Sequence, residues 1–457
     1  MSIKANPLSM GDPVGRKFFW KEGMYRGIYP GYANKVKELF DIGLISKLEQ
    51  ENLIPKTTIS KEQLDGFEMI LEQEKIHPVV YPYEWSFEMF KDAALTTLKV
   101  NKILMEFGYE TKDAHPSNIM FQGTTPKFID IGSIQKMNPG QMRWTAHSQF
   151  IHSFLEPLKV GAISDFSVTN TLLRNEVGVE SYSYLTLLHP INRLLGIKTA
   201  KKIQVAKEKY LSLGVSDKEN ITTNIPSVIV NTFLGLKKYN LLPFIKTNLS
   251  LLERKVRKIT RSKVKTVWGN YHDNFELTPR FKRLAEIINS VHVKSIFEVA
   301  ANQGFFSKYL LEHMDLDWIV ATDYDSKAVD TMYKENKGNK KFFVAFLNLM
   351  FPAKNSLSLK LKYRYKADIV LALAVTHHLI LTQGYQFDII IDKLSKYTNK
   401  YLLIEFMPLG LYSIGYEPKV PEWYTKDWYR SELEKRYSVI IEEQVEKNRI
   451  VFLCEKK

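Results

Sequence analysis

The chain has only one cysteine among its 457 residues, Cys454. A single thiol excludes an intrachain disulfide and a metal site built from several thiolates, which is typical of a protein in a reducing cytosol. The sequence also lacks an uninterrupted apolar run of the roughly 18 residues that a membrane-spanning helix needs. Its first residues lack the apolar core of a signal peptide. We therefore expect a cytoplasmic protein.

Internal repeats and low-complexity segments are absent as well. Hydrophobic residues make up 45% of the chain and charged residues 25%, which is a globular composition. The chain is too long for one ordinary hydrophobic core. We therefore expect two domains.

Acidic residues are scarce between Lys237 and Lys265, where ten Lys or Arg residues stand against the single acid Glu253. Three interpretations stay open: the solvated face of a linker helix, peripheral contact with anionic lipid headgroups or a charged glycan, and nucleic acid. The last is the weakest, because no zinc-ligand spacing or nucleic-acid-binding motif accompanies the charge. One expectation for residues 237–265 is thus contact with the inner face of the membrane.

The N-terminal half divides into two patterns. Short β-like runs and one helical stretch predict a small α+β lobe over about residues 1–83. Mostly helical patterns predict a second lobe over about residues 84–255. Within it, apolar spacing predicts a helix over residues 88–107 that Gly108 ends, and a short strand leads to Asp130.

A kinase-like motif follows that helix. Asp113 and Asn118 are five residues apart, and Asp130 follows Asn118 in Asp130-Ile131-Gly132. Phosphoryl transfer from ATP requires a carboxylate that orients the acceptor hydroxyl, together with an Asn and an Asp that hold magnesium ions. The pattern resembles the aminoglycoside-phosphotransferase-like kinases of small molecules. That resemblance implies Asp113 as the catalytic base, His115 as an organiser of the loop, Asn118 and Asp130 as Mg²⁺ ligands, and ATP as a cofactor.

The small lobe departs from the kinase pattern. Gly11 and Gly15 are too sparse for a glycine-rich phosphate loop, and no Val-Ala-Ile-Lys-like strand supplies the phosphate-binding lysine. Arg26, on its predicted strand, is a conceivable substitute. Three interpretations stay open: an active kinase, a pseudokinase that binds nucleotide or serves as a scaffold, and a coincidental match.

Strands and helices alternate in the C-terminal part, which predicts an α/β domain over residues 256–457 with a mainly parallel sheet. Glu298 is expected at the end of the first strand and Asp323 at the end of the second. In an open α/β sheet a ligand binds outside these strand ends, where Asp323 can accept hydrogen bonds from both ribose hydroxyls. Because Gly-x-Gly-x-x-Gly is absent, a nucleoside without a pyrophosphate fits better than a dinucleotide.

The same region, roughly Trp268 to Lys457, resembles the class I S-adenosylmethionine-dependent methyltransferases, which have a Rossmann-like fold. The resemblance implies S-adenosylmethionine as the cofactor. The residues implied at the cofactor are Glu298, Ala300, Asn302, Gly304, Asp323, Tyr324 and Asn348. Glu298 would engage the amino group of the cofactor, Tyr324 would pack on the adenine, and Asn348 would keep a hydrogen-bond acceptor where the family has Asp. Ala300 replaces a family glycine, which would weaken cofactor affinity, whereas Asn302 tolerates the conformation expected of it.

Two histidines follow the fourth strand of this domain, at the rim where a methyl acceptor should lie. An alcohol acceptor needs a base whose pKa is near neutral, and one of His377 and His378 is a candidate. Glu405, at the end of another strand, is a second candidate base. The alternative is that one histidine packs against a helix and the other orients the acceptor.

A degenerate kinase-like domain followed by a methyltransferase resembles bacterial proteins related to nodulation and capsule-polysaccharide proteins. This implies a saccharide, glycolipid or sugar-phosphate acceptor. One hypothesis is that the first domain phosphorylates a sugar hydroxyl and the second methylates that phosphate or a nearby hydroxyl. The alternatives are a methyltransferase with a non-catalytic recruitment module and a non-enzymatic interaction protein.

Overall fold

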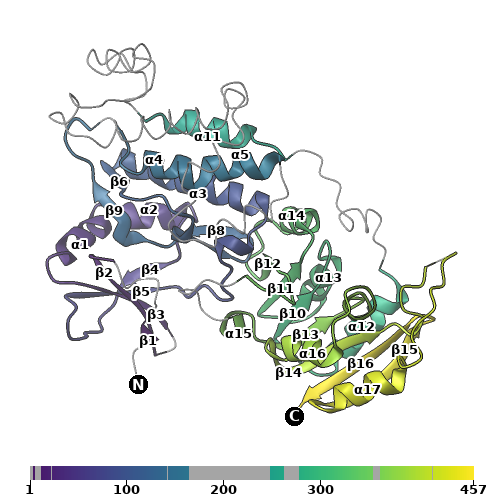
Figure 1. The fold of residues 1–457 in the computed structure, drawn as a ribbon. Helices are drawn as coiled ribbons and strands as arrows, with labels where there is room; N and C mark the ends of the chain where they lie inside the picture. The colour runs from purple at the N-terminus through teal and green to yellow at the C-terminus, as the bar shows by residue number, and fades with distance from the viewer. Residues whose placement is uncertain are drawn as a thin grey trace, which may run out of the picture.

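The computed structural model describes residues 4–5, 12–21, 23–141, 143–163, 247–261, 277–353, 361–413 and 415–457 (Figure 1). Two predicted features lie wholly or partly outside these residues. Residues 164–246 of the expected second helical lobe fall there, and so does much of the basic stretch, of which residues 247–261 are described.

The small lobe is built on an antiparallel sheet with the strand order β1-β2-β3-β5-β4. Its elements are β1 (Lys4–Ala5), β2 (Gly15–Trp20), β3 (Gly23–Ile28), α1 (Ala33–Asp41), α2 (Leu44–Gln50), β4 (Thr57–Ile59) and β5 (Met69–Gln73). The sequence predicted one helical stretch where α1 and α2 lie. Gly43 separates the two helices because it adopts a left-handed φ of 76°, which glycine reaches without a steric cost.

The second lobe is organised around α3 (Phe87–Glu106). Ser86 caps this helix by accepting the backbone N–H of Met89, and Gly108 follows its end with a φ of 80°, so the predicted helix is confirmed. The short strands and helices around it are β6 (Tyr109–Thr111), β7 (Ile119–Gln122), β8 (Thr125–Phe128), β9 (Ile134–Lys136), α4 (His147–Phe150), η5 (Ile151–Leu155), α5 (Glu156–Ile163) and α11 (Leu249–Lys258). β6 pairs with β9, and β7 forms a hairpin with β8.

Helix α11 belongs to this lobe, where it lies alongside α3 (Figure 1). Leu249, Leu252 and Val256 are its buried residues, while its basic residues are exposed. The expected division between residues 255 and 256 falls inside this helix, so we place the domain boundary after Lys258. Because the apolar side of α11 is covered, its exposed surface is the basic one.

The C-terminal domain contains a seven-stranded sheet with the order β12-β11-β10-β13-β14-β16-β15 (Figure 1). The strands are β10 (Ser295–Val299), β11 (Trp318–Asp323), β12 (Phe342–Phe346), β13 (Ala367–Ala372), β14 (Thr398–Phe406), β15 (Tyr437–Glu446) and β16 (Arg449–Lys456). The helices are α12 (Pro279–Asn289), α13 (Phe305–His313), α14 (Ser326–Glu335), α15 (Leu361–Arg364), α16 (Phe387–Ser395) and α17 (Lys426–Glu434). Strands β10 to β14 are parallel, as predicted, whereas β16 and β15 are antiparallel additions that the sequence did not predict.

A buried ion pair joins the two domains. Arg364 donates from Nη1 and Nη2 to the Glu84 carboxylate over 2.6 and 2.7 Å, and the Tyr365 hydroxyl donates to the same carboxylate over 2.8 Å. Arg364 also donates to the carbonyl oxygen of Val79 over 2.7 Å. Both charged side chains are shielded from water, so each needs the opposite charge as well as these hydrogen bonds.

The β7–β8 hairpin forms a second contact between the domains. At its turn, the backbone N–H of Thr124 donates to the carbonyl oxygen of Asn339 over 2.9 Å, and the Thr124 hydroxyl donates to that of Asn336 over 2.6 Å. A Cβ at Gly123 would lie 2.0 Å from the Asn339 oxygen, so only glycine allows this approach. Helix α14 also contacts α3, where the Tyr333 hydroxyl donates to Asp92 over 2.7 Å. No described helix combines the length and the apolarity that crossing a membrane requires.

The ion pair between the domains generates a stability prediction. Arg364→Ala leaves Glu84 buried without its partner, and we expect a loss of about 3–5 kcal/mol in the free energy of unfolding. The double variant Glu84→Leu/Arg364→Met should recover much of that loss, because no buried charge remains. Lys396→Ala, which removes an exposed pair with Asp392, is the control and should cost no more than about 0.5 kcal/mol. Urea denaturation followed by fluorescence measures all three, and equal effects of Arg364→Ala and Lys396→Ala would contradict the prediction.

Candidate functional site

The turn after β10 places three residues in left-handed backbone conformations. The φ angles of Ala300, Asn302 and Gly304 are 55°, 51° and 74°. Asn302 therefore adopts the conformation expected of it, and Gly304 precedes α13, where a Cβ would lie 2.7 Å from the Cγ of Met332. Ala300 carries a Cβ in a conformation that costs a non-glycine residue about 1–2 kcal/mol. The turn thus has the backbone shape of a glycine-rich loop, although Gly304 is its one glycine.

Asp323 lies at the end of β11 and closes this turn. Its Oδ2 accepts the backbone N–H of Asn302 over 2.8 Å, and its Oδ1 accepts that of Asp325 over 2.7 Å. Each oxygen retains capacity to accept a further hydrogen bond. Burial raises the pKa of Asp323 to about 6. A buried carboxylate held in this way is suited to accept hydrogen bonds from the two hydroxyl groups of a ribose.

Glu298 is the second buried carboxylate, at the carboxyl end of neighbouring β10. Only 4% of the residue is exposed, and the Ser307 hydroxyl donates to its Oε2. Burial raises the pKa of Glu298 to about 7, although Ser307 and Arg280 favour the charged form. An ammonium group beside Glu298 would hold it ionised. The two carboxylate acceptors at this turn therefore fit the ammonium and ribose hydroxyl groups of S-adenosylmethionine.

The two predicted adenine contacts have different surroundings. The ring of Tyr324 packs on Phe346 with 5.7 Å between the ring centres, and 64% of Tyr324 is exposed, so its ring can receive a flat ligand. Asn348 was expected to offer a hydrogen-bond acceptor. Its Oδ1 instead accepts the backbone N–H groups of Met350 and Phe351, each over 3.0 Å. Asn348 therefore stabilises its own turn with that oxygen, and only its amide nitrogen is left to meet a ligand.

His377 and His378 follow the end of β13, with 4.1 Å between their ring centres. His378 begins η7 (His378–Thr382), a π-helical turn of a kind that is frequent at functional sites. Burial lowers the pKa of His377 to about 3, and its Nδ1 has no hydrogen-bond partner within the described ranges. Burial also lowers the pKa of the less buried His378. Both rings are neutral at physiological pH and can accept a hydrogen bond from an acceptor hydroxyl.

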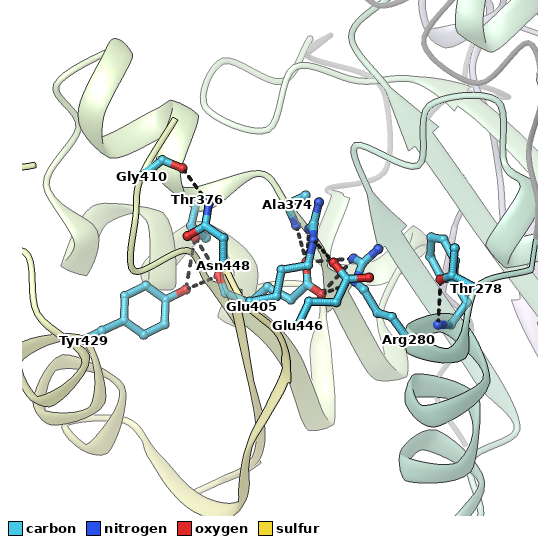
Figure 2. A network of polar contacts seen from close by, with 11 residues as sticks. Thr278, Arg280, Ala374, Thr376, Glu405, Gly410, Tyr429, Glu446 and Asn448 are labelled. Atoms are coloured by element: carbon cyan, nitrogen blue, oxygen red, sulfur yellow. Dashed lines mark hydrogen bonds and ion pairs between the residues drawn. The ribbon is translucent and has the colours of Figure 1, made fainter. Parts of the chain in front are cut away.

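Glu405, the other predicted base, is held at the centre of a polar network (Figure 2). Arg280 donates from Nε and Nη2 to its two oxygens, each over 2.8 Å, and Arg449 donates to Oε2 over 3.0 Å. The backbone N–H of Ala374 donates to the same Oε2 over 2.9 Å. Glu405 is fully buried. Both carboxylate oxygens are already engaged by two guanidinium groups and a backbone N–H, so we assign Glu405 a positioning role in place of the predicted one.

The same network fixes the segment that precedes the histidines. The Thr376 hydroxyl donates to the carbonyl oxygen of Glu405 over 2.9 Å, and the Tyr429 hydroxyl donates to the Thr376 hydroxyl over 3.1 Å (Figure 2). The sequence did not indicate Arg280, Arg449 or Tyr429. Each is far from Glu405 along the chain and carries no local motif, so only the pairing of elements reveals them.

The predicted kinase-like residues lie together in the N-terminal domain. The Nδ2 of Asn118 donates to Oδ1 of Asp113, and the backbone N–H of Ile129 donates to the carbonyl oxygen of Asn118 over 2.9 Å. Burial, with a contribution from Asp130, raises the pKa of Asp113 to about 6. His115 lies 2.8 Å from the Ser117 hydroxyl through its Nδ1 and stays within the loop.

Arg26 also reaches this site. Its Nη1 donates to Oδ1 of Asp130 over 2.6 Å, and its Nη2 donates to Asp12. A Cβ at Gly132 would lie 1.8 Å from that Nη2, so Gly132 makes room for the guanidinium. Within the described ranges, no three His, Cys, Asp or Glu side chains are placed to hold a metal. A Mg²⁺ ion at Asn118 and Asp130 would therefore need phosphate and water oxygens to complete its coordination.

Comparisons with known proteins find partial similarities. No family model matches the chain. Nodulation protein NoeA of Rhizobium meliloti (strain 1021) is 26% identical over 355 residues, which covers 74% of this chain and 71% of NoeA. A SAM-dependent methyltransferase from Aquifex aeolicus matches 40% of this chain and 100% of its own, with 14% identity and a TM-score of 0.29. The N-methyltransferase NodS from Bradyrhizobium japonicum WM9 matches 39% of this chain and 94% of its own, with 13% identity and a TM-score of 0.29.

The pKa of Glu298 generates a prediction about pH. A cationic amine at Glu298 favours the ionised carboxylate, so the affinity for S-adenosylhomocysteine should fall about tenfold for each pH unit below 7. Below pH 6 the fall should steepen, because Asp323 also takes up a proton. Isothermal titration calorimetry between pH 5.5 and 8 measures the affinity. In Glu298→Gln the affinity should be lower at pH 8 and nearly constant between pH 6 and 8. An unchanged slope in this variant would contradict the assignment.

Proposed function

We propose that the C-terminal domain is an S-adenosylmethionine-dependent methyltransferase. The observation that carries this proposal is the pair of buried carboxylates, Glu298 and Asp323, on adjacent parallel strands with the left-handed turn between them. Bound S-adenosylmethionine supplies an electrophilic methyl group. Asp323 would hold the ribose, Glu298 the ammonium group, and Tyr324 one face of the adenine.

We further propose that the methyl acceptor is a saccharide, a glycolipid or a sugar phosphate of a surface polysaccharide. The support is the similarity to NoeA, which is named a nodulation protein. Acceptors of this class offer hydroxyl and phosphate oxygens as nucleophiles. The position of His377 and His378, after the carboxyl end of β13, suits a role next to such an oxygen.

A second candidate function is phosphoryl transfer in the N-terminal domain, with ATP and Mg²⁺ as cofactors. The observation in its favour is the contact between Asp113 and Asn118, with Asp130 close enough to raise the pKa of Asp113. Asp113 would accept the proton of a sugar hydroxyl, while Asn118 and Asp130 would hold the metal. The alternative is a non-catalytic module that recruits the acceptor to the methyltransferase.

Surface glycans test both functions at once. Deletion of the gene should remove a methyl mass from the glycan, and a phosphate mass too if the first domain is a kinase. In that case, a gene copy with Asp113→Asn, placed in the deletion strain, should not restore the phosphate, because no base accepts the proton of the acceptor hydroxyl. Methylation of that phosphate should be absent too. A copy with Ser117→Ala, in the same loop, is the control. Mass spectrometry reads both groups, and an unchanged glycan after deletion would contradict the methyltransferase proposal.

The two histidines distinguish hydroxyl from phosphate methylation. If a hydroxyl is the acceptor, alanine at the histidine that acts as base should lower the rate on the order of 10²-fold or more, whereas a phosphate oxygen is already anionic and needs no base. His378 is the better candidate, because the pKa of about 3 makes His377 a weak base. The rate of methyl transfer to the isolated glycan measures the effect, with thermal unfolding to check the fold. Equal small effects of His377→Ala and His378→Ala would exclude a histidine base.

A further inference from the structure

Arg26 serves as a clamp in the N-terminal site. One nitrogen of its guanidinium group bonds to Asp130 and another to Asp12, and the side chain is fully buried. A planar guanidinium with two donors directed at two carboxylates is a fixed geometric link. Asp12 itself accepts the backbone N–H of Val14 over 2.9 Å, just before β2. The clamp therefore ties the segment that enters β2 to the strand end at Asp130.

Lys17 supplies a second cation to the same place. Lys17 and Arg26 are directly opposite each other on the antiparallel strands β2 and β3, so their side chains lie on one face of the sheet. The Nζ of Lys17 is 3.9 Å from Oδ1 of Asp130, and 14% of its side chain is exposed. The carboxylates of Asp130, Asp12 and Asp113 all act on this ammonium group. Lys17 is thus a nearly buried cation beside the predicted metal ligand Asp130, and the charge of the predicted base Asp113 also acts on it.

The two cations suit different tasks. Arg26 already has two carboxylate partners, and its guanidinium group fills the space that the missing side chain of Gly132 leaves. Lysine is a compact point charge on a flexible stem, which is the form in which proteins commonly bind phosphate. A phosphate chain bound through a metal at Asp130 would lie within reach of the Lys17 ammonium group.

We propose that Lys17, carried by β2, binds the phosphates of a nucleoside triphosphate, and that Arg26 closes the site as a clamp. This inference rests on the proposed kinase function and changes the residue assignment within it. The phosphate-binding lysine then lies on β2. In the kinase motif it lies on the next strand, where this chain has Arg26. On β3 the buried cation is Arg26, whose guanidinium group already bonds to Asp130 and Asp12.

Binding of a fluorescent ATP analogue with Mg²⁺ to the full chain tests this assignment. Lys17→Met should weaken binding at least about tenfold, because a buried charge contact to phosphate is lost. Lys21→Met is the matched control: Lys21 follows β2, is exposed and pairs with Glu62, so its loss should leave binding unchanged. Affinity for S-adenosylhomocysteine should be the same in both variants, which verifies that the C-terminal domain stays folded.

Arg26→Lys separates the clamp from the phosphate contact. We expect a lower melting temperature, because one ammonium group cannot replace the two directed bonds, but a smaller loss of nucleotide affinity than in Lys17→Met. If the wild type binds the analogue and Lys17→Met binds it equally well, the assignment to Lys17 fails while a nucleotide site remains. If the wild type binds no analogue, the kinase proposal fails and the role of Lys17 with it.

Discussion

The buried ion pair between Glu84 and Arg364 holds the two domains in one arrangement. The Glu84 carboxylate accepts hydrogen bonds from Arg364, from Tyr365 and from the backbone N–H of Tyr81. Removing two charges from water is costly unless hydrogen bonds satisfy them, and this carboxylate has several donors. A packing that separated the domains would remove the Arg364 and Tyr365 donors from this carboxylate. The pair therefore makes one relative placement of the domains specific, whatever its net contribution to stability.

Elements that border the two candidate sites also form this interface. Helix α14 starts just after Asp323, and its far end meets the turn of the β7–β8 hairpin through Asn336. That hairpin joins the segment of Asn118 to the segment of Asp130. If cofactor binding displaced α14, the displacement would act on the hairpin, which lies between Asn118 and Asp130 in the chain. Helix α14 and the β7–β8 hairpin therefore connect the two candidate sites through the interface.

Local patterns predicted the parts of the fold that local physics determines. The helix before Gly108 follows from apolar spacing and a glycine at the helix end, and it is confirmed. The turn residues around Asn302 were predicted because few residue types tolerate a positive φ. By contrast, β15 has a mixed polar pattern, and the apolar run in β16 does not by itself say that β16 pairs antiparallel with β14 and β15 at the end of the sheet. The sequence also could not predict that residue 132 must be glycine, because the guanidinium group that lies against Gly132 belongs to Arg26 on a distant strand.

Glu298 and Glu405 show why a sequence motif alone does not identify a functional carboxylate. Both lie near the carboxyl ends of parallel strands, and both are almost fully buried. Glu298 has a serine as its hydrogen-bond partner, so burial dominates and raises its pKa to about 7. Glu405 has two arginines, which neutralise it and turn it into an anchor for β13, β14 and α12. A carboxylate whose charge is left uncompensated can gain from a cationic ligand, whereas one already paired gains little. The placement of the arginines, which lie far from Glu405 in the sequence, therefore decides which of the two acids is left to pair with a cationic ligand.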